Sequence, residues 1–199
     1  MSKNDYWKLS AFEGAKLIRD GSISAEDLVS SCIERVNQTN NKINAIVDDL
    51  SASALEKAHE LDKLTKKGKF QGPLHGVPIT IKENIDQKGY ATPNGLEALK
   101  DLIAPGNAPV VDNLEQDGAI VIGRTNTPEF SMRGTTDNVI HGRTFNPWND
   151  WASPGGSSGG ASAAVMSGMG SIAHGNDIAG SLRIPSTATG ACTVKPGLG

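Results

Sequence analysis

Apolar residues recur at helical spacing in the first third of the chain. Leu28, Cys32 and Val36 share one face of a helix that we expect to begin after Ser24. A further helix is predicted from Ser51 to about Lys67, with apolar positions at Leu55, Ala58, Leu61 and Leu64. The region 1–70 is therefore predicted to be mainly helical.

Two shorter sequence patterns predict further elements in the region 1–70. Ser10 and Glu13 have the spacing of a capping box, in which each side chain accepts a hydrogen bond from the other residue's backbone N–H. This pattern predicts a helix that begins at Ser10 and stops at Gly21. Asn44 to Val47 is predicted to form a short strand.

After Gly68 the sequence pattern changes from mainly helical spacing to short apolar runs that predict strands. Val77 to Lys82 is rich in β-branched residues and predicts a strand, and Ala119 to Ile122 is a short apolar run between glycines that predicts a buried strand. Helices are predicted at 108–117 and 161–170, whereas 143–154 is rich in turn residues. Helices that alternate with buried strands indicate an α/β fold. We expect one domain over 1–199, with a catalytic α/β core at 71–199.

Composition and charge exclude several classes of function. The 199 residues carry a net charge of −3, so the chain has no excess of positive charge with which to track a phosphate backbone, and we expect no direct binding of nucleic acid. No apolar run approaches the length needed to cross a bilayer, and no signal peptide is evident. We expect no membrane interaction and a cytoplasmic location. Cys32 and Cys192 match no metal spacing.

The segment from Gly155 to Gly160 is the first candidate for chemistry. It lacks the lysine that a phosphate-binding P-loop requires. It does match the G-x-S-x-G pattern of a nucleophile elbow around Ser157, but the preceding residues 149–154 do not form the strand that an elbow needs. Taken alone, this segment is also compatible with a third interpretation, a flexible Gly/Ser linker.

Several further motifs occur in a fixed order around this segment. They are His75–Lys82, Gly118–Asn126, Pro128–Phe130, Asn146–Trp148, Gly175–Pro185 and Val194–Pro196. In this combination the chain resembles the amidase signature family, densely from about Gly72 to Gly199 and more weakly before that. The resemblance implies a mixed β-sheet core flanked by helices. It also implies an incomplete domain, because members of the family are longer and their sheet and substrate pocket continue past the position of Gly199.

The resemblance implies a mechanism with three catalytic residues. Ser181 matches the nucleophile, Lys82 the base, and Ser157 the bridging serine, whose peptide bond is cis in relatives. A serine hydroxyl needs a neighbour that takes its proton, and a lysine can do so at neutral pH only where burial lowers its pKa. The hydroxyl of Ser157 can both accept and donate, so it can relay the proton. We therefore expect hydrolysis of a small-molecule carboxylic amide through an acyl-enzyme on Ser181.

The same resemblance suggests binding residues. The backbone N–H groups of Ile178, Ala179 and Gly180 are expected to stabilise the oxyanion, although most relatives carry glycine at the position of Ala179. Ser131 matches a position that contacts substrate. Asp177 is expected to organise the loop. The family uses no cofactor, no metal and no catalytic histidine, and the four histidines of this chain have no metal spacing.

Two alternatives to a stand-alone amidase stay open. One is a glutaminase subunit of a tRNA-dependent amidotransferase, which would need partner chains; Asn176 and Ala179 favour the stand-alone enzyme over this one. The other is a truncated, inactive homologue. The identity of the amide and the oligomeric state, with a homodimer among the options, are not readable from the sequence.

Overall fold

The computed structural model describes residues 2–197; Met1, Leu198 and Gly199, which fall within the predicted domain range, lie outside the described residues. The first part contains a 3₁₀ helix η1 (Lys3–Lys8), helices α1 (Ala11–Arg19) and α2 (Ala25–Ile43), strand β1 (Ile46–Asp49) and helix α3 (Ser51–Thr65). The capping box of Ser10 and Glu13 is confirmed, with both reciprocal hydrogen bonds present. Asn44 ends α2 in a left-handed conformation, so β1 begins two residues later than predicted.

The second part supplies the rest of the sheet. In order, it contains β2 (Pro78–Lys82), η2 (Glu97–Leu99), α4 (Pro109–Gln116), β3 (Ile120–Thr125), η3 (Glu129–Ser131), α5 (Gly159–Met166), β4 (Ile172–Ala173) and α6 (Arg183–Thr189). The predicted strands at 77–82 and 119–122 and the helix at 108–117 are confirmed to within a few residues. Helix α5 ends earlier than predicted, because Gly168 and Gly170 have positive φ angles.

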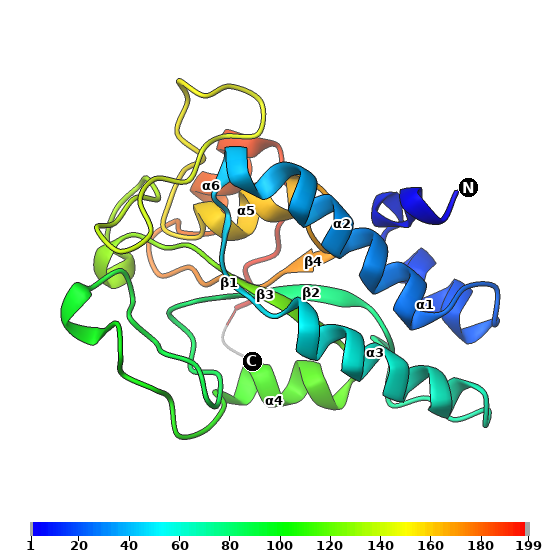
Figure 1. Ribbon diagram of the computed structural model, residues 1–199. Coiled ribbons are helices and arrows are strands. Elements are labelled where there is room, and N and C mark those ends of the chain that lie inside the picture. Colours follow the sequence, from blue (N-terminus) through cyan, green and yellow to red (C-terminus); the bar gives the residue numbers. More distant parts are fainter. Residues whose placement is uncertain (1, 198–199) are drawn as a thin grey trace.

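The four strands form one mixed sheet in the order β1-β3-β2-β4 (Figure 1). Strand β1 runs antiparallel to β3, whereas β2 is parallel to both β3 and β4. Helices α2 and α5 cover one side of the sheet and α4 lies on the other (Figure 1). The expected α/β fold with a mixed sheet flanked by helices is confirmed.

Each face of the sheet has its own apolar core. Ile120 and Ile122 point toward α2, α3 and α5, while Val121 and Ile79 point toward α4. This alternation follows from the opposite direction of successive side chains in a strand. Because β2, β3 and β4 are parallel, their carboxyl ends lie at one edge of the sheet, where ligands bind in open α/β sheets.

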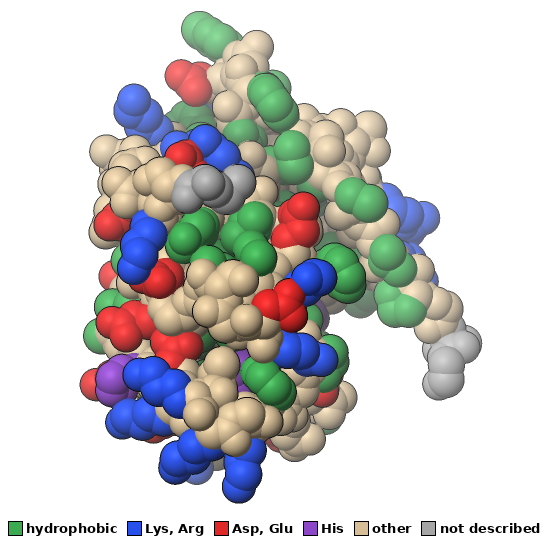
Figure 2. Space-filling model, turned by 90° about the vertical axis from the view of Figure 1, so that its right-hand side faces the viewer, with side chains coloured by type: hydrophobic (Ala, Val, Ile, Leu, Met, Phe, Trp, Pro, Cys, Tyr) green, Lys and Arg blue, Asp and Glu red, His purple; other side chains and the backbone are tan. Residues whose placement is uncertain are grey.

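Among the described residues, no helix combines the length and apolar character needed to cross a bilayer. Figure 2 shows basic side chains gathered at the lower edge of one face, with acidic side chains above them. Lys66, Lys67 and Lys69, which follow α3, are exposed. Residues 191–197 form no helix or strand and are mostly exposed.

Candidate active site

Lys82 is the last residue of β2 and has no exposed surface. Its Nζ atom donates hydrogen bonds to Ser157 Oγ at 2.7 Å, to Ser158 Oγ at 3.1 Å and to Asn176 Oδ1 at 2.7 Å. Three acceptors match the three N–H groups of an ammonium. Strand β2 therefore positions the Lys82 amine in a polar cluster, to which the loop of Ser157 and Ser158 and the loop of Asn176 also contribute.

Burial controls the protonation of this amine. Removal from water lowers the pKa of Lys82 to about 7, against a smaller opposing effect of Asp177 and Glu83. A substantial fraction of the amine is then neutral at neutral pH, with a lone pair that can accept a proton. Such a side chain has the properties of a general base.

Ser157 lies in a tightly packed loop that leads into α5. The peptide bond between Gly156 and Ser157 is cis, as the family resemblance implies. The residues from 154 to 164 are all buried, and the N–H of Gly159 donates to Thr136 Oγ1. A Cβ atom at Gly160 would lie 2.5 Å from the backbone oxygen of Asn126. The Gly/Ser segment is thus a rigid part of the core, and the interpretation as a flexible linker is wrong.

No strand leads into this loop, so the nucleophile-elbow interpretation is wrong as well. Residues 149–158 contain turns and irregular backbone only. The elbow pattern requires a strand–turn–helix unit. Here the loop follows the turn-rich segment, as predicted from the sequence.

Ser181 is held next to this loop by its backbone. Its carbonyl oxygen accepts a hydrogen bond from the N–H of Ser158 at 3.1 Å, and Ser181 is half-buried. Within residues 2–197 its hydroxyl has no hydrogen-bond partner in this structure. Ser181 and Ser157 line the same cavity of about 390 Å³, together with Asn84, Ser131 and Asn176. The structure therefore brings Ser181 to the cluster of Lys82 and Ser157 but shows no direct hydrogen bond between the two serine hydroxyls.

Asp177 organises the loop that precedes Ser181. Its buried carboxylate accepts hydrogen bonds from the N–H groups of Gly180 at 2.7 Å, Leu182 at 3.1 Å and Arg183 at 3.2 Å. The Arg183 guanidinium also contacts it, at 2.9 and 3.0 Å, and this hydrogen bonding holds the pKa of the Asp177 carboxyl well below its usual range. The carboxylate is thus fully occupied as an anchor for the loop.

This anchor changes the expected oxyanion donors. The N–H of Gly180 points to Asp177, so it is not available to a substrate in this conformation. In the described part of the chain, the N–H groups of Ile178, Ala179 and Ser181 have no backbone or side-chain acceptor. These three N–H groups are free to donate to an anion beside Ser181.

Ser131 also lines the cavity. Its hydroxyl donates to Asn94 Oδ1 at 2.8 Å, accepts from Asn84 Nδ2 at 2.9 Å and lies 3.0 Å from Thr127 Oγ1. Thr127 in turn donates to the carbonyl oxygen of Ser157 at 3.2 Å. Ser131 is therefore part of a network that supports the cis loop. The sequence does not predict the hydrogen bonds of Thr127 and Asn84, because their local sequence does not indicate which distant residues they contact.

Among the described residues, no histidine side chain forms a hydrogen bond with a serine. His75 is bound by Thr65 and Gln71 within the core. Burial, and to a lesser extent the charge of Lys82, lower the pKa of His174 to about 4. His141 forms an ion pair with the buried Glu83 at 2.9 Å. Across residues 2–197, no group of three or more His, Cys, Asp or Glu side chains is arranged to hold a metal ion.

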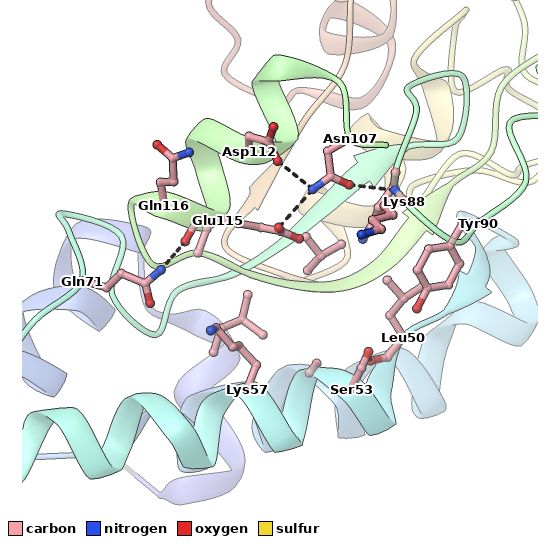
Figure 3. Close-up of a pocket in the computed structure, with 15 residues that line it drawn as sticks. Leu50, Ser53, Lys57, Gln71, Lys88, Tyr90, Asn107, Asp112, Glu115 and Gln116 are labelled. Carbon is pink, nitrogen blue, oxygen red and sulfur yellow. Dashed lines mark hydrogen bonds between the residues drawn. The ribbon is translucent and has the colours of Figure 1, made fainter. Parts of the chain in front are cut away.

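A second, larger hollow of about 540 Å³ lies between α3 and α4 (Figure 3). Asn107 donates to Asp112 and Glu115 there, and burial raises the pKa of Glu115. Its lining shares no residue with the cavity around Ser181. None of the site residues predicted from the sequence lines this hollow.

Known proteins match this chain over nearly its whole length. The family model Amidase matches residues 27–199. The indoleacetamide hydrolase of Bradyrhizobium diazoefficiens is 55% identical over 98% of this chain and 37% of its own length. A glutamyl-tRNA(Gln) amidotransferase subunit of Natranaerobius thermophilus is 38% identical over 96% of this chain and 39% of its own length.

Solved structures agree with these relatives. A fatty acid amide hydrolase superposes with a TM-score of 0.91 at 32% identity, covering 94% of this chain and 33% of that chain. The chain thus spans about two fifths of the length of the curated relatives it matches. On the family match and these identities, the chain belongs to the amidase signature family.

Proposed function

We propose that this chain carries the catalytic centre for hydrolysis of a carboxylic amide, with Ser181 as nucleophile, Ser157 as proton relay and Lys82 as base. The observation that carries the proposal is the fully buried Lys82 amine, 2.7 Å from Ser157 Oγ and with its pKa lowered to about 7. Burial of a lysine costs free energy, and lysines of lowered pKa are typical of catalytic bases.

The proposed reaction has two steps. The Ser181 hydroxyl attacks the amide carbonyl while its proton passes through Ser157 to Lys82. The N–H groups of Ile178, Ala179 and Ser181 stabilise the oxyanion, and the leaving ammonia or amine takes up the proton. Water then attacks the acyl-enzyme, again with the assistance of Lys82, and releases the acid.

Apolar side chains around the cavity favour an apolar acyl group. Phe130, Met132 and Ile178 are 63%, 82% and 98% exposed, and they line the cavity beside Ser181. A relative of 55% identity is an indoleacetamide hydrolase. Indoleacetamide and other amides with an aromatic acyl group are therefore the first substrates to test.

The proposal is tested by acylation and by turnover. A fluorophosphonate probe should label the wild-type chain at Ser181, and Ser181→Ala should remove the label. Ammonia release from indoleacetamide and from acetamide is then compared. An unlabelled, folded wild-type chain would contradict the proposed nucleophile and favour an inactive homologue.

The similarity to amidotransferase subunits supports a second candidate, a glutaminase that works only with partner chains. The two candidates differ in what they need. Ammonia release from an aromatic amide by the chain alone favours the stand-alone amidase. Release from glutamine only after addition of the partner chains favours the second candidate. The 55% identity to a hydrolase supports the first candidate more strongly than the second.

A further inference from the structure

The Lys82 amine must change its hydrogen bonds when it becomes a base. A protonated lysine has three N–H donors, whereas a neutral one has two donors and one lone pair. Of its three contacts, to Ser157, Ser158 and Asn176, one must therefore reverse direction in the neutral form. The neighbours decide which one reverses.

Asn176 cannot reverse its contact. The atom that faces Lys82 is the amide oxygen Oδ1, at 2.7 Å, and an amide oxygen only accepts. Asn176 therefore takes one of the two N–H groups of the neutral amine. The position lies immediately after Gly175 and before the anchoring Asp177, so its backbone is held by the same loop.

Ser158 is also committed as an acceptor. Its hydroxyl donates its single hydrogen to the carbonyl oxygen of Asn176 at 3.2 Å, and it accepts from the N–H of Asn176 at 3.3 Å. The remaining lone pair faces Lys82 at 3.1 Å. Ser158 thus takes the second N–H of the neutral amine.

Only Ser157 is left for the lone pair. Among the described residues its hydroxyl has no partner other than Lys82, so its hydrogen is free to turn toward Nζ. A Ser157 hydroxyl that donates to Lys82 exposes its own lone pairs to the Ser181 side of the cavity. This is the polarity that a proton relay from Ser181 requires.

We propose that Asn176 is a positioning residue that, with Ser158, directs the lone pair of Lys82 toward Ser157. This inference rests on the proposed function and deepens it, because it assigns the direction of proton transfer to a side chain outside the three proposed catalytic residues. The Asn176 oxygen also stabilises the protonated amine, since it is the negative end of a dipole in a buried site. Loss of that oxygen should therefore have two separate effects.

The experiment measures Lys82 directly and through acylation. Lysine labelled with ¹³C and ¹⁵N is incorporated into the wild type, Asn176→Leu and Asn176→Asp, and the Lys82 amine is titrated by NMR. The rate of fluorophosphonate labelling is followed over the same pH range. Asn107→Leu, which removes an amide from the hollow between α3 and α4, is the matched control and should titrate and label as the wild type does.

Opposite shifts are expected in the two variants. Asn176→Leu should lower the pKa of Lys82 and yet slow labelling at its high-pH plateau by about tenfold or more, because the lone pair is no longer directed. Asn176→Asp keeps the acceptor and adds charge, so it should raise the pKa and approach the wild-type rate at high pH. A variant that had merely lost its fold would show neither pattern.

Two results would overturn the inference. One is an Asn176→Leu variant with an unchanged plateau rate; the other is a shift of the Lys82 pKa in the same direction in both variants. Should Asn176→Leu fail to fold, the shift in a folded Asn176→Asp variant, which is nearly isosteric, decides alone: a raised pKa supports the contact, and an unshifted one contradicts it. If the wild type is not labelled, the proposed function fails, but the NMR titration still tests the contact.

Discussion

Replacement of Lys82 by methionine tests the burial of this amine through protein stability, without any assay of activity. Methionine is unbranched and of similar length, so it can fill the space at the end of β2 with little strain. The substitution removes the only titrating group of the cluster formed with Ser157, Ser158 and Asn176. The lost hydrogen bonds cost a constant amount at every pH, so the pH dependence isolates the contribution of the charge.

The size of the effect follows from the two pKa values. The pKa of Lys82 is about 7 in the folded chain, and that of an unfolded lysine is about 10.4. Between these values the unfolded state binds more protons than the folded state, so wild-type stability rises with pH. The slope is about 1.4 kcal/mol per pH unit, and the full difference amounts to roughly 5 kcal/mol. Below about pH 7 both states are protonated, and the penalty is constant.

The assay is urea unfolding of both proteins between pH 6 and pH 10. The free energy of unfolding of the wild type, minus that of Lys82→Met, should be flat below about pH 7 and climb above it. Lys67→Met, at an exposed position, is the control for added hydrophobicity and lost charge. Parallel curves for the wild type and Lys82→Met over the whole range would refute the lowered pKa, and with it the assignment of Lys82 as a neutral base.

Three further outcomes follow from other contacts. Asp177→Asn turns a donor toward the backbone N–H groups of the loop, so labelling of Ser181 should slow at least about tenfold and amide hydrogen exchange of the loop should speed up. Gly160→Ala forces a methyl group against backbone atoms of a neighbouring segment and should lower the free energy of unfolding by about 1–3 kcal/mol, measured in urea. Burial lowers the pKa of His141, but the contact with Glu83 outweighs this effect, and the net result is a raised pKa. The pair therefore stabilises the fold at low pH, and this stabilisation is lost as the pH rises above about 6.5. His141→Gln should remove this pH dependence, as measured by thermal unfolding.

The parts of the fold that rest on local physics were predictable. The capping box of Ser10 and Glu13 involves residues three apart, and its hydrogen bonds are those the sequence predicts. The strand that ends at Lys82 follows from a run of β-branched residues that is buried along its full length. Strand β4 was not predicted, because its two residues carry no periodic signal and owe their conformation to pairing with β2.

The site was predictable only in part, for the same reason. The resemblance indicated Lys82, Ser157 and Ser181, and their proximity is a property of the shared fold. It did not indicate that Gly180 donates its N–H to Asp177, which narrows the set of oxyanion donors. Nor did it reveal the contact of Lys82 with Asn176, which joins residues on separate segments and depends on a side-chain rotamer.

Neighbouring residues on one short loop connect Lys82, the proposed base, to Ser181, the proposed nucleophile. The loop is aligned with the sheet because β4 pairs with β2 and the N–H of His174 donates to the carbonyl oxygen of Thr80, two residues before Lys82. From that fixed point, Asn176 directs its side chain to Lys82, while Asp177 binds the backbone that leads to Ser181. The distance between Asn176 and Ser181 is therefore set by the backbone geometry of a few bonded residues. A shift of β4 along β2 would move Asn176 and Ser181 together, which preserves the relation between them while changing their position relative to Lys82.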